Sequence, residues 1–402
     1  MKILIATEVY KPVVNGVVTS VCILEESLKK LGHDVRIMCP SSDRHNSIEG
    51  NVYRIGSSGG EHFCHGARLA TNPSRKAVKP IIDWHPDVVH SQTEFFTFVL
   101  AKYVAWECGV PVIQTYHTLY EDYTHYFSPS AAVGRKVAVF FSKAILKNVS
   151  GVIVPSEKIR ERLMRYKVST TMRVIPTGLD FSKFSEPSPT AREEIREELD
   201  IPKEARIIMT VGRVVREKNM PELLEYFKRY TEEGRWPEKI VFILAGDGAY
   251  LENLKKEAGE LGIEDLVRFT GLVPQDRIAD HYAAGEVFLS ASTSETQGLT
   301  YYEAMAAGTP VLCRDDPCLA PILTTGSNGF TYTDYETFAD HLTDLLGDPD
   351  LCARMVEEGK KRVAEFSGEK FASRVLEFYQ EIQREYYAEH PRRLPKDAGL
   401  AN

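Results

Sequence analysis

The sequence lacks a hydrophobic run long enough to cross a membrane. No apolar stretch in its 402 residues approaches the ~18 residues that a membrane-spanning helix needs. The opening segment, MKILIATEVY, has no basic stretch followed by a long apolar one, so we expect no signal peptide. We therefore expect a soluble or peripheral protein.

Paired cysteines and clustered metal ligands are also missing. The seven cysteines are scattered without a C-x-x-C pair, which indicates reduced thiols in a cytosol. His62, Cys64 and His65 lie close together, and so do Asp315 and Asp316, but no second group of ligands accompanies either set. We expect no metal and no bound cofactor.

The glycine-rich fingerprint of dinucleotide-binding proteins is absent from the first loop. Residues 8–20, EVYKPVVNGVVTS, contain a single glycine, Gly16. A dinucleotide site needs G-x-G-x-x-G at this place, so the loop counts against an NAD-dependent enzyme.

Charge is unevenly divided along the chain. Residues 1–184 carry 23 Lys and Arg against 16 Asp and Glu, whereas the remainder carries 26 against 41. A basic first half and an acidic second half indicate that only the first half meets an anionic surface. We expect no nucleic-acid partner. The length predicts two domains of roughly 180 to 200 residues each.

Apolar, β-branched runs alternate with helical stretches in two successive series. Continuous apolarity marks strands buried on both faces, as in a parallel sheet with helices on each side. The fold class is therefore α/β, with two doubly wound domains. The predicted strands are Lys2–Thr7, Val35–Pro40, Asp87–His90, Pro111–Tyr116, Gly151–Pro155, Arg173–Pro176, Arg206–Val214, Lys239–Ala245, Val267–Thr270, Glu286–Ser290, Pro310–Cys313 and Phe330–Thr333.

The boundary between the domains is placed by composition. Phe181–Pro202 is rich in Ser, Pro and charge, which predicts a linker opening into a helix. A last helix is predicted for Phe366–Tyr387, followed by a frayed tail from His390. The predicted parts are thus 1–184, 185–365 and 366–402.

The most informative stretch is SASTSETQGLTYYEAMAAGTP, residues 290–310. Glu295 and Glu303 lie eight residues apart, in a strand, loop and short helix that Gly308 ends. Such a helix start leaves backbone N–H groups at Gly298, Leu299 and Thr300 free to hold a phosphate. A plain alternative is a capping box, in which Glu303 only holds its own helix start.

This stretch closely resembles the E-x7-E motif of family 4 glycosyltransferases of the GT-B fold. The resemblance implies that Glu295 holds hydroxyls of the donor sugar and that Glu303 holds the ribose. It also implies that the last helix crosses back onto the first domain, and that no catalytic metal is used.

The resemblance extends to the run GRVVREKN. It implies that Arg213 and Lys218 stabilise the charge of a departing nucleoside diphosphate, although a surface arginine and lysine would otherwise be unremarkable. It assigns the loops at Gly246 and Val273 to the nucleotide.

The resemblance also assigns the first loop, with Asn15 and Gly16 at its turn, to the donor phosphates and the acceptor. Many members of this family have two glycines where this chain has Asn15-Gly16. A plain strand-to-helix turn is the alternative for this loop.

The run TYHTLYEDYTHYF, residues 115–127, is similar to the branch of family 4 that glucosylates diacylglycerol. The similarity implies that His117 belongs to the active site and that Tyr123 and Tyr126 face the acceptor. A lone histidine is more often structural, which is the alternative for His117.

A basic segment predicts membrane contact. Residues 131–167 hold nine Lys and Arg and two acids, and Lys136, Lys143 and Lys147 share one stripe of a helix over residues 131–148. Val133, Val137, Phe140, Phe141 and Ala144 lie beside this stripe, which is typical of a helix in a bilayer interface. The alternative is the solvated face of an ordinary helix.

These observations predict a retaining hexosyltransferase that moves glucose from UDP-glucose onto a lipid hydroxyl, such as that of diacylglycerol. The expected partners are a nucleotide-sugar donor, a lipid acceptor and the anionic inner face of the cell membrane. The alternatives are the same chemistry on a soluble acceptor, a nucleotide-sugar epimerase of the same fold, and a non-catalytic sensor of sugar nucleotides.

Overall fold

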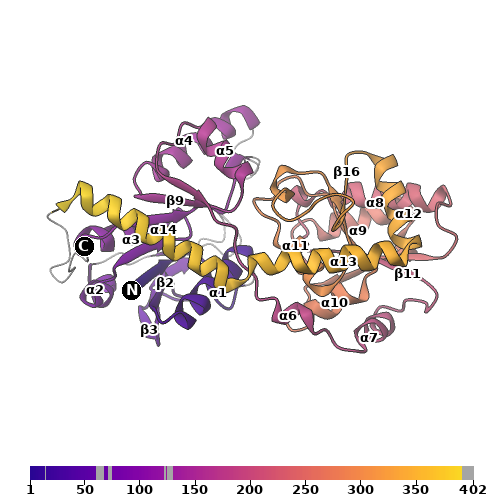
Figure 1. The fold of residues 1–402 in the computed structure, drawn as a ribbon, viewed down its shortest axis with the longest axis horizontal. Coiled ribbons are helices and arrows are strands. Elements are labelled where there is room, and N and C mark those ends of the chain that lie inside the picture. Colours follow the sequence, from indigo (N-terminus) through magenta and orange to yellow (C-terminus); the bar gives the residue numbers. More distant parts are fainter. Residues whose placement is uncertain (14, 60–67, 71–74, 122–123, 125–129, 392–402) are drawn as a thin grey trace. The chain divides into compact units, whose positions relative to one another are not determined.

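The computed structural model describes residues 1–13, 15–59, 68–70, 75–121, 124 and 130–391, and its ribbon is drawn in Figure 1. The chain forms two compact units. Unit 1 contains Met1–Gly178 and the chain from Gly368 onward, and unit 2 contains Leu179–Ser367. The tail predicted to fray lies almost entirely outside the described residues.

Unit 1 is built on an eight-stranded sheet with the order β10-β9-β8-β7-β1-β2-β4-β3, in which neighbours pair in parallel except β3 with β4. A separate two-stranded ribbon joins β5 to β6. The strands are β1 (Lys2–Ala6), β2 (Asp34–Pro40), β3 (Ser47–Glu49), β4 (Val52–Ile55), β5 (Ser57–Gly59), β6 (Arg68–Ala70), β7 (Val88–Ser91), β8 (Val112–Thr115), β9 (Gly151–Val154) and β10 (Met172–Val174).

Helices cover both faces of this sheet. Along β1, Ile3 and Ile5 join a core with α1 and α14, whereas Leu4 and Ala6 join a core with α2 and α3. This alternation is what a strand buried on both faces requires. The helices are α1 (Gly16–Lys30), α2 (Arg75–Trp84), α3 (Phe96–Cys108), α4 (Ala131–Leu146), α5 (Glu157–Arg165) and α14 (Gly368–Glu389).

The last helix belongs to unit 1. Phe371, Val375, Phe378 and Ile382, spaced for one helix face, are all buried in the core of that unit. Helix α14 packs along α1 (Figure 1). The prediction of a helix that returns to the amino-terminal domain is therefore confirmed.

Unit 2 repeats the plan with a six-stranded parallel sheet, ordered β13-β12-β11-β14-β15-β16. Ile207 and Ile208 again face different cores. The elements are α6 (Ser182–Ser185), α7 (Ala191–Glu198), β11 (Arg206–Val211), α8 (Met220–Glu232), β12 (Ile240–Ala245), α9 (Leu251–Glu260), β13 (Val267–Gly271), α10 (Ile278–Ala284), β14 (Val287–Ser290), α11 (Leu299–Ala307), β15 (Val311–Arg314), β16 (Phe330–Tyr332), α12 (Tyr335–Gly347) and α13 (Pro349–Val363).

The doubly wound α/β prediction is confirmed, and a strand is found at each of the twelve predicted places. The short strands β3 to β6 were missed because each is only three or four residues long. The helix predicted to follow the linker is found as α7, but Phe181–Pro202 is not a linker, because Phe184, Ile195 and Ile201 are buried in the core of unit 2. The chain therefore enters unit 2 before residue 184.

No helix among the described residues is both long enough and apolar enough to cross a bilayer.

Candidate active site

Three loops of unit 2 meet through glycines at the carboxyl ends of β11, β12 and β13. A Cβ added to Gly246 would lie 1.8 Å from the carbonyl oxygen of Gly212, and one added to Gly248 would lie 2.3 Å from that of Val214. Gly246 also forms a β-bridge with Gly271. Only glycine permits this approach, so the three loops form one backbone surface.

The loop after β11 carries the two predicted cations. Arg213 is exposed, and no described carboxylate lies within ion-pair distance of its guanidinium group. Lys218 ends a short 3-10 helix, Arg216–Lys218, and Asn219 then takes a left-handed conformation with φ of 52° to begin α8. The turn into α8 therefore sets the position of Lys218.

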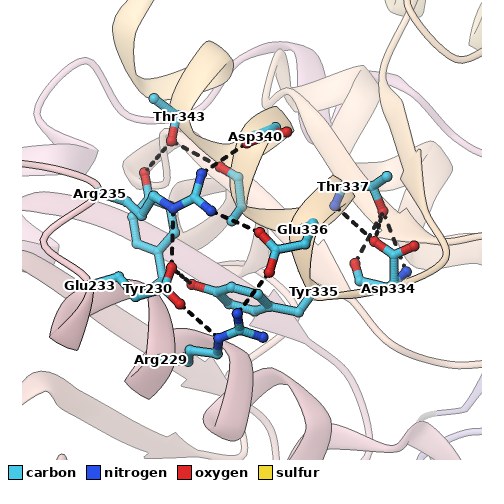
Figure 2. Close-up of polar contacts among 11 residues, drawn as sticks. Arg229, Tyr230, Glu233, Arg235, Asp334, Tyr335, Glu336, Thr337, Asp340 and Thr343 are labelled. Atoms are coloured by element: carbon cyan, nitrogen blue, oxygen red, sulfur yellow. Dashed lines mark hydrogen bonds and ion pairs between the residues drawn. The ribbon is translucent and has the colours of Figure 1, made fainter.

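Helix α8 is held at both ends. At its start, Glu222 accepts hydrogen bonds from Asn219 (2.9 Å) and Arg314 (2.6 Å). At its other end, a network of ion pairs joins it to α12 (Figure 2). The network links Arg229, Glu233 and Arg235 to Tyr335, Glu336 and Asp340.

The loop after β14 brings the first glutamate of the predicted motif to the lysine. The Lys218 ammonium group and the Glu295 carboxylate form an ion pair, in which the side chains are 23% and 13% exposed. Gly298, with φ of 78°, then begins α11, and Gly308 ends it with φ of 81°. Leu299 and Thr300 form the first, half-buried turn of that helix.

The second glutamate, Glu303, does not cap its own helix. No side chain caps α11, and the Glu303 carboxylate instead accepts a 2.8 Å hydrogen bond from the Tyr282 hydroxyl of α10. The capping-box alternative is therefore wrong. Burial raises the pKa of Glu303, and the hydrogen bond from Tyr282 partly opposes this rise.

The loop after β13, predicted to contact the nucleotide, has one buried and one exposed apolar side chain, and Asp316 lies in the loop after β15. The Val273 side chain is buried in the core of unit 2, whereas its neighbour Leu272 is 73% exposed. Asp316 accepts from the Cys318 N–H at 2.8 Å and caps a 3-10 turn, which is a structural role.

In unit 1, the first loop forms a capped helix start. The Asn15 side chain accepts a 2.9 Å hydrogen bond from the Val18 N–H, and α1 begins at the exposed Gly16. The cap accounts for Asn15 without a ligand.

His117 follows β8 and is half-buried. Its Nε2 lies 2.7 Å from Oε1 of Gln92, which follows the neighbouring strand β7. Burial lowers the pKa of His117 to about 4, so its ring is neutral at pH 7.

Two carboxyl groups that follow strands β7 and β1, the next two strands of the sheet after β8, escaped the sequence analysis. Glu94 follows β7, is buried, and accepts hydrogen bonds from Gln114 (3.2 Å) and Tyr120 (2.5 Å). Burial raises the pKa of Glu94 to about 8 and also raises the pKa of Glu8, which follows β1. Their position just after buried strands was the available signal.

The helix predicted over residues 131–148 exists as α4, with its basic stripe exposed. Lys136, Lys143 and Lys147 are exposed, and Lys147 follows the last helical residue. An open hollow on this helix is lined by Arg135, Lys136, Val139, Phe140 and Lys143.

The apolar residues of α4 divide between the surface and the protein interior. Val133, Val137 and Phe140 are 56%, 51% and 75% exposed. Phe141 turns inward instead, with its ring centroid 5.3 Å from that of Tyr120, so its predicted place beside the basic stripe is wrong.

Several predicted residues cannot be placed. Tyr123, Tyr126, His62, Cys64 and His65 lie outside the described residues. Within the described ranges, no group of three or more His, Cys, Asp or Glu side chains is arranged to hold a metal ion.

Solved structures of other proteins share the fold of this chain. Anabaena HepE, solved with UDP and glucose, superposes with a TM-score of 0.72 at 18% identity, covering 95% of this chain and all of HepE. Sucrose-phosphate synthase from Thermosynechococcus elongatus gives a TM-score of 0.73 at 22% identity, covering 96% of this chain and all of that one. The chain has the GT-B fold of glycosyltransferases.

Sequence comparison then gives the family. Residues 14–183 match the family model of Glycosyltransferase Family 4, and residues 191–362 match that of Glycosyl transferases group 1. An alpha-monoglucosyldiacylglycerol synthase from Streptococcus pneumoniae is 36% identical over 94% of this chain and 85% of its own length. An alpha-monoglucosyldiacylglycerol synthase from Acholeplasma laidlawii is 31% identical over 95% of this chain and 97% of its own length. The chain belongs to glycosyltransferase family 4.

The glycine contact predicts that Gly246→Ala is destabilising. Its Cβ cannot fit against Gly212, so the loops must separate, at a cost of about 1 to 3 kcal/mol in the free energy of unfolding. Denaturant unfolding measures this cost. Gly259→Ala is the control, because a Cβ at that position in α9 meets nothing within 4 Å. Equal stabilities of the two variants would contradict the argument.

The raised pKa of Glu94 predicts a pH-dependent stability. Between about pH 5 and 8 the folded protein keeps a proton on Glu94 that the unfolded chain, in which this carboxyl has its ordinary pKa of 4.5, has lost. This group therefore lowers the free energy of unfolding as pH rises through that range. Glu94→Gln mimics the protonated acid, so its unfolding free energy should fall less between about pH 5.5 and 8. Parallel pH profiles for the two proteins would refute this.

Proposed function

We propose that this protein transfers glucose from UDP-glucose, with retention of the anomeric configuration, to a lipid hydroxyl such as that of diacylglycerol. The relatives that are 36% and 31% identical are both alpha-monoglucosyldiacylglycerol synthases, and they match nearly the whole chain. An α-linked product from an α-linked donor requires retention. The names of these relatives support the class of reaction and the lipid acceptor of the proposal.

The observation that carries the proposal is the convergence of Lys218 and Glu295 at the carboxyl edge of the unit 2 sheet. Open α/β sheets bind ligands at this edge. A cation and a hydroxyl-binding carboxylate side by side suit the junction of a sugar and a diphosphate. Ion pairing with Glu295 also holds the Lys218 side chain in place before the donor arrives.

The chemistry follows from where charge develops. As the bond between the sugar and the diphosphate breaks, the departing oxygen gains negative charge, which Lys218 and the exposed Arg213 stabilise more in the transition state than in the ground state. The acceptor oxygen attacks the anomeric carbon on the same face, and its proton passes to the departing phosphate. In unit 2, Glu295 orients the sugar and Glu303 holds the ribose; in unit 1, His117 binds a hydroxyl of the sugar or of the acceptor.

No step of this mechanism requires a metal, and we propose that none is used. The cations of Arg213 and Lys218 take the place that a divalent ion has in other nucleotide-sugar enzymes.

We further propose that α4 rests on the anionic inner face of the cell membrane. Its exposed lysines lie beside Val133, Val137 and Phe140, which are apolar side chains open to solvent. Each basic residue near an anionic leaflet contributes about 1 kcal/mol, and the exposed apolar side chains add burial in the interface.

A UDP-release assay with a panel of sugar donors tests the reaction. We expect UDP release from UDP-glucose that depends on vesicles containing diacylglycerol, with formation of a glucosylated lipid. Release with soluble acceptors alone would indicate the soluble-acceptor alternative. Loss of UDP-glucose without UDP release would indicate an epimerase, and binding without turnover a sensor.

Arg213→Ala tests the stabilisation of the leaving group. Removing one charge-stabilising donor typically lowers kcat by roughly 10² to 10³. We expect this loss with little change in the unfolding temperature, because Arg213 is exposed and holds no described carboxylate. Wild-type kcat in this variant would remove Arg213 from the mechanism.

Substituting Lys136, Lys143 and Lys147 by Gln tests the membrane surface. Three charges at about 1 kcal/mol each predict roughly 100-fold weaker partitioning onto anionic vesicles, measured by co-sedimentation. Added salt should narrow this difference, because it screens the wild-type attraction.

A double substitution of Lys255 and Lys256 by Gln on α9 provides the control. These lysines are also exposed but lie in unit 2, so partitioning should not change. An equal loss of vesicle binding in both variants would show that binding depends on the net charge of the protein and not on the lysines of α4.

A further inference from the structure

The His117 ring has one hydrogen-bond partner among the described residues, and that partner can only accept. Oε1 of Gln92 lies 2.7 Å from His117 Nε2. An amide oxygen has no proton to give, so Nε2 must carry the hydrogen. In a neutral ring the other nitrogen, Nδ1, then holds a lone pair.

The orientation of the Gln92 amide decides this assignment, and His90 fixes that orientation. The Gln92 Nε2 atom lies 3.2 Å from Nδ1 and 3.1 Å from Nε2 of His90. A donor in the ring plane reaches one nitrogen at such a distance, so an atom nearly equidistant from both lies over the ring face. An N–H group is attracted to that face, whereas a carbonyl oxygen is repelled. The amide therefore points its oxygen at His117.

The His90 ring is itself held on both sides. Its Nδ1 lies 2.6 Å from the hydroxyl of Tyr379 on α14, and its Nε2 lies 2.6 Å from the hydroxyl of Thr115 on β8. His90, Gln92 and Tyr379 are buried. The chain of contacts from α14 through His90 to Gln92 thus has little freedom to rearrange.

We propose that Gln92 is a positioning residue that fixes His117 in the tautomer with hydrogen on Nε2, so that Nδ1 accepts a hydrogen bond from a substrate hydroxyl. This inference rests on the proposed function for the identity of that hydroxyl, which belongs to the sugar or to the acceptor. It makes His117 an acceptor and excludes it as a proton donor to the diphosphate. The low pKa of His117 is consistent with this, because the ring stays neutral through physiological pH.

The tautomer is measured directly by ¹⁵N NMR of the histidine rings, without reference to activity. In the wild-type protein, His117 Nε2 should be protonated and Nδ1 should not. Gln92→Met keeps the side-chain length but removes the acceptor, so the ring should shift to a mixture of tautomers. Gln114→Met is the matched control, because the Gln114 amide contacts Glu94 and not His117.

Kinetics separate this inference from the proposed function. Gln92→Met should lower kcat/KM for UDP-glucose roughly tenfold, the effect of one hydrogen bond, and should add nothing in a His117→Ala background. Gln92→Glu keeps an acceptor and should retain the Nε2-protonated ring. Full activity of His117→Ala would refute the role of His117 in the reaction and leave the tautomer assignment standing.

A His117 ring that keeps hydrogen on Nε2 alone in folded Gln92→Met would overturn the proposal. If Gln92→Met fails to fold, Gln92→Glu tests the tautomer of His117 instead. A His117 ring protonated only on Nδ1 in that variant would refute the assignment of hydrogen to Nε2.

Discussion

The ion pair between Lys218 and Glu295 is the interaction on which the proposed site depends. It joins the loop after β11 to the loop after β14, two neighbouring strands of the unit 2 sheet. The backbone contacts of Gly246 and the anchoring of α8 by Glu222 hold the same edge in place. A cation, a carboxylate and close-packed backbone therefore meet where a parallel sheet binds its ligands.

Near the carboxyl ends of β7 and β8 in unit 1, burial favours the neutral form of three side chains, as it does for Glu303 in unit 2. His90 and His117 have lowered pKa values, and Glu94 has a raised one. All three groups are therefore predominantly neutral at pH 7 and recognise partners through hydrogen bonds. Of the three, only His117 is not fully buried, and its neutral ring suits a hydroxyl group, whereas the cations of unit 2 suit a phosphate.

The sequence predicted those features that depend on local pattern. Apolar runs such as Lys239–Ala245 located every central strand, and the short motif around Glu295 located the loop that binds Lys218. The partners of Glu303 and His117 could not be predicted, because Tyr282 and Gln92 lie 21 and 25 residues away and meet them only in the folded chain. The linker prediction failed because it relied on the polar composition of Phe181–Pro202. Three apolar residues within that segment, Phe184, Ile195 and Ile201, pack into the core of unit 2.

The central claim is that the Lys218 ammonium group grips the diphosphate of the donor. It is tested most directly by calorimetric titration of wild type and Lys218→Gln with UDP and with uridine, which differ only by the diphosphate. The account predicts that the substitution weakens UDP binding about tenfold or more and leaves uridine binding unchanged. Unchanged UDP binding, or equal losses for both ligands, would contradict it.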